Sequence, residues 1–272
     1  MFNRSAAPPV ARADLEHATP AEVRAAVRNG RWQGNTKRLA LGHHQANLTI
    51  VPERYAFDFM RFCFRNPKPL PMLDVTEPGD PEPRKAAPGA DVTTDAGSYV
   101  LFRDGKLVER VANLDGLWRA DHVAFLTGCN LSLDQVMLES QVPLPHLLNE
   151  EAFPAQYISS IPCVEAGAFK GNLVVSMRPI ADRLLTRVTE ITSRFGLCHG
   201  APVHIGDPDA IGIKNLNHVD WGKPNAVPAQ HTPVFWACGI TAQAAAMACR
   251  IPEMIAHAPG HMFVTDLPVR ES

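Results

Sequence analysis

From about residue 121 to the C-terminus, short apolar runs alternate with segments that favour helix. The apolar runs share β-branched and aromatic residues and a polar exit: DHVAFLTGCN, GNLVVSMRP, APVHIGDP, PVFWACG and EMIAHAPG. The helical segments between them include SLDQVMLES, IADRLLTRVTEITSRFG and TAQAAAMAC. This alternation predicts an α/β fold with a mostly parallel sheet covered by helices.

The first half of the chain carries clear local signals. Thr19, Pro20 and Glu22 form the start of a helix with a capping box, and Asn29-Gly30 ends it. Asp104-Gly105 lies between two β-type runs and predicts a hairpin. Residues 67–97 are rich in Pro, Gly and Asp, and a loop of this length is usually functional or mobile.

The domain organisation follows from the middle of the chain. Residues 130–198 contain a helix, two strands and a further helix, which predicts a smaller inserted α+β domain. Residues 1–129 and 199–272 would then form a discontinuous main α/β domain.

Composition excludes several classes of partner. The 26 basic and 28 acidic residues give a net charge of −2, so nucleic acid is not expected. No apolar run approaches the roughly 20 residues that span a bilayer, and the N-terminus lacks the apolar region of a secretory signal. The six cysteines show no CxxC spacing, which predicts a reduced, cytoplasmic setting. The sequence is compatible with a homodimer but does not fix the oligomeric state.

The predicted strands end in residues that can carry chemistry. In an open parallel sheet, side chains beyond the carboxyl ends of the strands converge on one rim, where ligands bind. We therefore expect Cys129, Asp207, Cys238 and His257 to share a pocket. The predicted helix after Gly239 begins at Thr241, and its free N–H groups would favour a carboxylate or an oxyanion.

Each catalytic candidate also has a structural interpretation. Asp207 and His257 are the first acid/base candidates and His204 the second, although a buried histidine bonded to a carbonyl explains His204 equally well. Cys238 and Cys129 fit buried structural thiols, and the alternative is a pair of acid/base thiols.

The substrate-binding candidates are cationic or amide side chains. Arg178 is either a carboxylate clamp or part of an interdomain salt bridge. Gln45 and Asn47 alternate along a predicted strand, so they face the same side as site amides or as backbone partners. His261 and Asp266 are second choices for the site.

Several long motifs resemble the hydro-lyase family that is also called D-glutamate cyclase-like. They cover the chain from about residue 15 to its end: GHHQANLTIVP, YAFDFMRFCFRNPKPLPML, VAFLTGCNLSLDQV, APVHIGDPDAIGI, PVFWACGITAQ and IAHAPGHMFVTD. The resemblance implies a three-layer main domain with a smaller α+β domain. It also implies reversible dehydration of D-glutamate to 5-oxo-D-proline.

The chain departs from that family's pattern at two places. Pro145 stands where the family tends to carry Arg, and Ile158-Ser159-Ser160 replace a segment that tends to read Arg/Lys-Thr-Asn. If those positions bind the substrate's carboxylates, the changes imply a less acidic substrate or a lost activity.

Two further functions remain open from the sequence. No cofactor is identified with certainty, but a divalent metal held by His204, Asp207, His257 and Asp266 would make the protein a metal-dependent lyase or hydrolase. The other is a non-catalytic protein that binds a small carboxylate.

Overall fold

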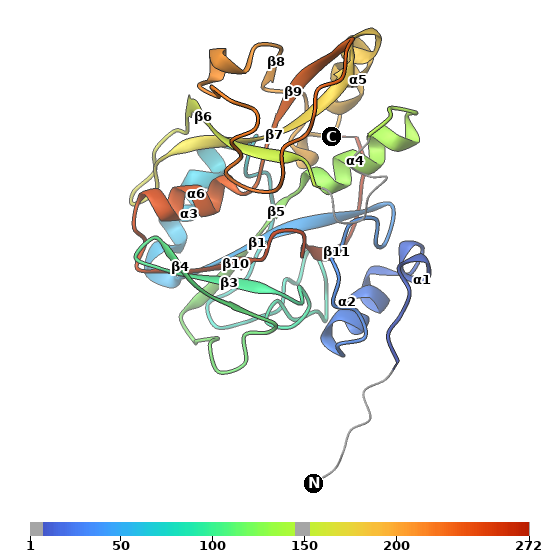
Figure 1. Cartoon of the computed structure of the whole chain (residues 1–272). Coiled ribbons are helices and arrows are strands. Elements are labelled where there is room, and N and C mark those ends of the chain that lie inside the picture. Colours follow the sequence, from blue (N-terminus) through green and yellow to red (C-terminus); the bar gives the residue numbers. More distant parts are fainter. Residues whose placement is uncertain (1–7, 145–152, 272) are drawn as a thin grey trace.

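The computed structural model describes residues 8–144 and 153–271, and Figure 1 shows the course of the chain. Two β-sheets form its framework. The seven-stranded sheet has the order β2-β5-β1-β10-β3-β4, and β11 also pairs with β1. Its strands are β1 (His43–Pro52), β2 (Met72–Val75), β3 (Tyr99–Arg103), β4 (Lys106–Val111), β5 (His122–Gly128), β10 (Glu253–His257) and β11 (Phe263–Pro268).

The second sheet has four strands in the order β6-β7-β9-β8. They are β6 (Ala155–Pro162), β7 (Asn172–Ala181), β8 (His204–Ile205) and β9 (His231–Ala237). This sheet therefore draws its strands from both sides of residue 198, where the sequence predicted the smaller domain to end.

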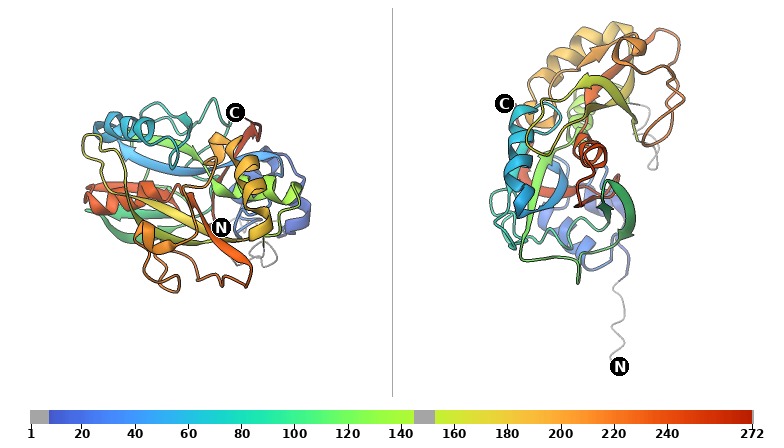
Figure 2. Two further views of the ribbon diagram at one scale, coloured as in Figure 1. Left: turned by 90° about the horizontal axis from the view of Figure 1, so that it is seen from above. Right: turned by 90° about the vertical axis from the view of Figure 1, so that its left-hand side faces the viewer.

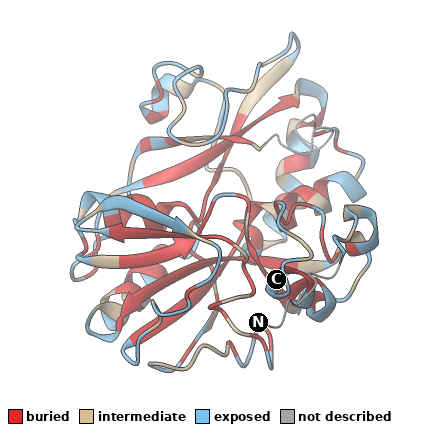
Figure 3. Ribbon diagram, turned by 60° about the horizontal axis from the view of Figure 1, so that its bottom comes forward, coloured by how far each residue is buried: buried red, intermediate tan, exposed pale blue. Residues whose placement is uncertain are grey.

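The α/β class is confirmed, but the expectation of a mostly parallel sheet was wrong. Every strand pairing among the described residues is antiparallel. The sequence misled because β5 is buried along its whole length and β1 beyond its first residue, which is typical of parallel strands covered on both faces. Figure 3 shows the buried residues in red, and they follow the strands in the interior of the molecule.

Most helices lie between the sheets or on the outer face of the second sheet, whereas the first two helices pack beside β11. The α-helices are α1 (Arg12–Glu16), α2 (Pro20–Arg28), α3 (Glu53–Arg65), α4 (Asn130–Glu139), α5 (Leu185–Ser193) and α6 (Thr241–Ala248). The short 3₁₀ helices are η2 (Asp182–Leu184), η3 (Gly196–Cys198) and η4 (Pro208–Ile211). Side chains of α3 and α6 join both sheets in one core, whereas α4 and α5 pack on β7 and β9 from outside (Figure 2).

Two local predictions are confirmed. The Thr19 side chain accepts a bond from the Glu22 amide and the Glu22 carboxylate accepts one from the Thr19 amide, which completes the capping box of α2. Asp104 and Gly105 have φ values of 49° and 75° and connect β3 to β4, as a type I′ hairpin turn requires.

The proline-rich segment 67–97 is a structural cover. Its Ala86, Ala87 and Val92 are buried against the face of the first sheet that points away from the second sheet. The Tyr99 hydroxyl donates to the Val92 carbonyl at 2.8 Å and fixes the segment there. The segment also contains β2, and its length reflects the apolar surface that it covers.

Candidate functional site

A cavity of about 90 Å³ lies where the two sheets meet, and we call it the central pocket. It is lined from β1, from the β5–α4 and β9–α6 junctions, from β7 and from the end of β10. The polar and thiol side chains on its wall are Asn47, Cys129, Asn130, Gln156, Ser176, Arg178, Cys238 and His257. Five of the predicted site residues thus come together here, although the strands that carry them run antiparallel.

His257 lies at the last position of β10, where the ladder with β1 ends after the pair Thr49 and Ala256. Its Nδ1 lies 3.1 Å from the Leu48 amide nitrogen and 3.2 Å from the Leu48 carbonyl oxygen. Burial lowers the pKa of His257 to about 4, with a smaller contribution from His261, against the bond to Leu48. The imidazole is therefore neutral at pH 7, and Leu48 can hold either tautomer.

Arg178 is fully buried on β7. Its Nε donates to Asp134 Oδ1 at 2.6 Å, and its Nη1 donates to Ser176 Oγ at 3.0 Å. Its Nη2 lies 2.6 Å from the same Asp134 oxygen but makes no hydrogen bond among the described residues. The guanidinium also lies over the Trp236 ring at 5.4 Å. Asp134 thus neutralises Arg178 and fixes the direction of its fork.

Asn130 and Ser176 extend this network into the pocket. Asn130 Nδ2 donates to Ser176 Oγ at 3.0 Å and to the Ala237 carbonyl at 2.8 Å. The Asn130 side-chain oxygen is buried without a partner among the described residues. Ser176 Oγ accepts from both Asn130 and Arg178, so its own proton is directed away from them.

Sequence reasoning missed Asn130, Ser176 and Asp134. The signals were present: Ser176 is two residues from Arg178 on one strand, and Asp134 is four residues from Asn130 on one helix. Both spacings place the two side chains on one face. What the sequence could not provide is the packing of α4 against β7.

Cys129 and Cys238 both line the central pocket and are free thiols. Burial raises the pKa of the Cys129 thiol, and the Leu131 amide bond to its sulfur opposes the shift. Burial also raises the pKa of Cys238. Both side chains are therefore protonated thiols at neutral pH.

Asn47, Gly239 and Thr241 form a closely packed joint between β1 and α6. Asn47 Nδ2 donates to the Gly128 carbonyl at 2.6 Å. A Cβ atom at Gly239 would lie 2.1 Å from Asn47 Nδ2, so only glycine fits beside this amide. The Thr241 amide donates to the Cys238 carbonyl at 3.1 Å, and its hydroxyl accepts from Val174. The Thr241 amide is therefore not free to bind a ligand. Thr241 stabilises the turn between β9 and α6.

Asp207 and His204 do not line the central pocket. The exposed Asp207 carboxylate accepts from the Asp209 amide at 3.0 Å and caps η4. A ring nitrogen of His204, Nε2, lies 2.6 Å from the Asp207 carbonyl oxygen. The expected common pocket for Asp207, Cys238 and His257 therefore forms without Asp207, because β8 is the edge strand of the second sheet.

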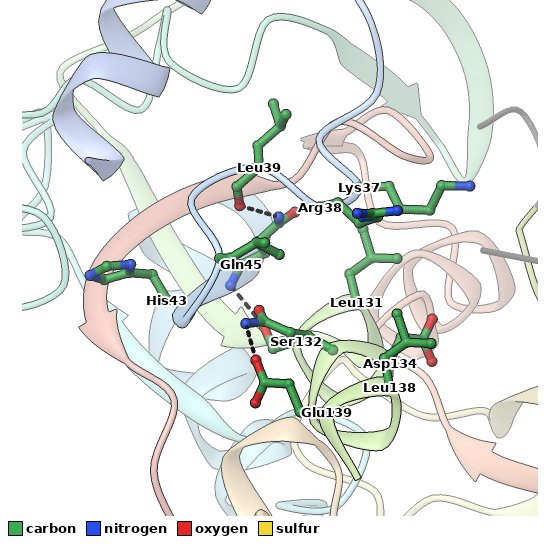
Figure 4. Close-up of a pocket in the computed structure, with 12 residues that line it drawn as sticks. Lys37, Arg38, Leu39, His43, Gln45, Leu131, Ser132, Asp134, Leu138 and Glu139 are labelled. Atoms are coloured by element: carbon green, nitrogen blue, oxygen red, sulfur yellow. Dashed lines mark hydrogen bonds between the residues drawn. The ribbon is translucent and has the colours of Figure 1, made fainter. Parts of the chain in front are cut away.

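Gln45 lines a second cavity of about 120 Å³, shown in Figure 4. Its side-chain amide donates to the carbonyls of Thr36 at 2.7 Å and Leu39 at 3.2 Å, and its backbone amide donates to Ser132 Oγ. Asp134 lines this cavity too, on the helix that also contributes to the central pocket. Gln45 thus holds the loop before β1, and it does not line the central pocket.

The last two candidates lie outside the central pocket. Asp266 forms a bidentate pair with Arg24 of α2 at 2.9 and 3.1 Å. His261 Nε2 lies 3.2 Å from Arg110 Nη2. Within the described part of the chain, no group of three or more His, Cys, Asp or Glu side chains could hold a metal ion, so His204, Asp207, His257 and Asp266 are not brought together.

The positions where the chain departs from the expected family pattern are only partly described. Pro145 lies outside the described residues. Ser159 is buried and donates to the Leu173 carbonyl, whereas Ile158 and Ser160 are exposed. Ile158, Ser159 and Ser160 do not line the central pocket. In residues 8–144 and 153–271, no helix is long and apolar enough to cross a membrane.

Comparison with known proteins adds independent information. A family model described as D-glutamate cyclase matches residues 123–266. A protein of Thermoanaerobacter sp. (strain X514) named "Putative hydro-lyase" is 48% identical over 254 residues, which cover 93% of this chain and 96% of that protein. A protein of the same description from Bacillus subtilis (strain 168), YcsI, is 46% identical and covers 91% and 96%. The matched segment contains Cys129, Asn130, Asp134, Ser176, Arg178, Cys238 and His257.

Proposed function

The chain belongs to the D-glutamate cyclase family, and from this premise we propose that its central pocket catalyses the reversible dehydration of D-glutamate to 5-oxo-D-proline and water. The names of its relatives support the lyase class. One observation carries the proposal: a buried guanidinium and a neutral imidazole line the same pocket.

The chemistry requires proton transfer as well as charge stabilisation. The α-ammonium group loses two protons, its nitrogen forms a bond to the γ-carboxyl carbon, and one carboxyl oxygen leaves as water after gaining two protons. No net proton is consumed. The site must therefore accept a proton at nitrogen, return one to oxygen and stabilise the negative oxygen in between.

We assign the proton transfers to His257. When Nδ1 donates to the Leu48 carbonyl, Nε2 is a free base that can take the ammonium proton. When Nδ1 accepts from the Leu48 amide, Nε2 carries the proton and can donate it. Both bonds are available without movement of the ring, so one residue serves both directions of the reaction.

We assign the binding of a substrate carboxylate to Arg178 with Ser176 and Asn130. The guanidinium is the natural partner of a carboxylate, and its Nη2 lies 2.6 Å from Asp134 Oδ1 but makes no hydrogen bond among the described residues. The Ser176 hydroxyl can donate to the other carboxylate oxygen, because Asn130 and Arg178 already fill its acceptor sites. The orphan oxygen of Asn130 suits the substrate's ammonium group.

A second candidate function rests on the two thiols in the pocket. A pair of cysteines can remove and return a proton at the α-carbon, which would make the enzyme an epimerase. That chemistry needs one thiolate, and burial raises the pKa of both Cys129 and Cys238. Cyclisation is therefore the better-supported reaction.

The experiment is a proton NMR incubation of the full chain with D-glutamate, L-glutamate, 5-oxo-D-proline and 5-oxo-L-proline in turn. We expect interconversion of the D pair and a loss of about 100-fold or more in His257→Gln, as for removal of a general base. His204→Gln is the matched control, because His204 lies outside the pocket, and it should retain activity within about twofold of the unsubstituted chain.

The other outcomes decide between the alternatives. Exchange of the α-proton without ring closure, abolished by Cys129→Ser and Cys238→Ser, would support the epimerase. A thermal shift with glutamate but no turnover would support a carboxylate-binding protein and overturn the enzymatic proposal.

A further inference from the structure

A larger hollow of about 520 Å³, separate from the two cavities described above, lies against the end of α2 and the edge strand β4, and we call it the basic groove. It shares no lining residue with the central pocket. Arg28, Arg110 and His261 line it together with Trp32, and none of its described lining residues is Asp or Glu. This composition favours an anion and disfavours a metal ion, because metal sites need anionic or neutral donor ligands.

Arg110 supplies the unneutralised charge of the groove. It is exposed on β4, its Nε donates to Ser98 Oγ at 2.8 Å, and its Nη2 lies 3.2 Å from His261 Nε2. It has no carboxylate partner among the described residues. Arg28, in contrast, is already paired with the buried Asp95 at 2.6 Å.

The rest of the wall is held in place by backbone hydrogen bonds. The Ala26 carbonyl accepts from the Arg31 and Trp32 amides. The Thr36 amide donates to the Gly260 carbonyl at 2.8 Å, and the Met262 amide donates to Thr36 Oγ1 at 3.0 Å, so the loop is fixed on both sides of His261. An anion would therefore meet a rigid surface with donors already in place.

We propose that the basic groove is a second ligand site, which binds a small organic oxyanion through the guanidinium of Arg110. The planar fork of arginine matches the two oxygens of a carboxylate or of a phosphate group. Ser98 and His261 hold one edge of the fork and leave Nη1 to the ligand. The site lies apart from the proposed catalytic pocket and does not depend on its activity.

Two tryptophan side chains allow the two sites to be observed separately. Trp32 lines the basic groove, whereas Trp236 packs against Arg178. Both indole N–H groups are buried without a hydrogen-bond partner among the described residues, so each NMR signal reports a change in the surroundings of its own ring. The experiment is a titration of the ¹⁵N-labelled full chain with glutarate and, separately, with inorganic phosphate.

We expect a saturable shift of the Trp32 indole signal with at least one probe, and the probe that acts identifies the oxyanion as a carboxylate or a phosphate. Arg110→Gln should weaken this binding about tenfold or more, because it removes a charge-assisted bond. Arg103→Gln is the control: Arg103 is exposed on the adjacent β3 but does not line the groove, and affinity should stay within about twofold.

The proposal is overturned if neither probe moves the Trp32 signal, or if Arg110→Gln binds as tightly as the unsubstituted chain. An equal loss in Arg103→Gln would show a diffuse charge effect and would also overturn it. Because binding is measured without turnover, these outcomes are independent of the catalytic proposal.

Discussion

The buried guanidinium of Arg178 depends on the carboxylate of Asp134. Both side chains are almost completely inaccessible to solvent, and 2.6 Å separates the charged atoms. A buried pair of this kind contributes less to stability than its distance suggests, since both charges lose their hydration. Its main effect is to orient the fork of Arg178 toward Ser176.

Removal of one member of this pair should be costly. We expect Asp134→Asn to lower the free energy of unfolding by about 3–5 kcal/mol, because it leaves a buried charge without its counterion. Urea denaturation measures this change. Asp209→Asn is the control, because Asp209 and Lys214 are both largely exposed and 3.4 Å apart, and it should change stability by less than about 1 kcal/mol. Equal urea midpoints for the two variants would contradict the assignment.

At the scale of elements, the joint between β1 and α6 shows how tightly the pocket is assembled. The amide of Asn47 occupies the space that a side chain at Gly239 would need, and it bonds to the Gly128 carbonyl at the end of β5. One amide thus bonds the middle of β1 to the end of β5 and packs against the turn before α6.

We expect Gly239→Ala to destabilise the protein by about 1–3 kcal/mol, the usual cost of forcing an extra methyl group into a packed site. The double variant Gly239→Ala with Asn47→Ala should be less destabilised than the sum of the two single changes, because the clash disappears with the amide. Urea midpoints of the four proteins give this coupling. If the losses of stability in the two single variants add up to the loss in the double variant, the alanine side chain at position 239 does not clash with Asn47.

The elements themselves were largely predictable, whereas their pairing was not. Thr19 with Glu22 and Asp104 with Gly105 are local signals that depend on neighbouring residues, and both were correct. The direction of β1 relative to its neighbours is set by three strands from two distant parts of the chain, β5 and the C-terminal pair β10 and β11. The sequence around each strand does not show which distant strand it pairs with. The alternation of apolar runs and helical segments therefore suggested parallel strands.

The same limit explains the candidate site. His257, Arg178 and the two thiols were recognised as chemistry-bearing residues at strand ends, and they do meet. Asp207 was predicted to lie in the site because parallel strands would end at one rim of the sheet. This prediction was wrong, because the strand before Asp207, β8, is a two-residue strand at the edge of the second sheet. Asn130, Ser176 and Asp134 were overlooked because their importance comes from Arg178, which only the fold brings to them.

For the molecule as a whole, one core joins both sheets. Val51 and Phe125 of the first sheet and Val175 and Phe235 of the second belong to the same cluster, together with Phe59 of α3. The central pocket lies at this junction, and most of the side chains that line it are buried. Several buried histidines among the described residues are held in their neutral form.

Acid should therefore destabilise the protein well above the range in which carboxylates titrate. The pKa of each of His44, His199 and His257 is lowered by burial to about 4. An unfolded chain has histidine pKa values near about 6.5, so between these values the unfolded state binds more protons and stability falls as pH falls. Each histidine contributes a slope of up to about 1.4 kcal/mol per pH unit.

The measurement is the urea midpoint at pH 7, 6 and 5, with a decrease expected across the series. His204→Gln should leave the slope unchanged, because His204 lies on an edge strand outside the core. A midpoint that is constant from pH 7 to pH 5 would mean that these imidazoles are protonated within the folded protein.

The end of the β1–β10 ladder has a consequence of its own. At Leu48 the backbone partners a ring nitrogen of His257 where a regular strand would continue with main-chain bonds. Whenever Nδ1 carries a proton, in the charged ring or in one of the two neutral tautomers, it faces the Leu48 carbonyl as a donor and the Leu48 N–H loses its acceptor. The last backbone bonds on this side of β1 therefore depend on the protonation of one ring nitrogen.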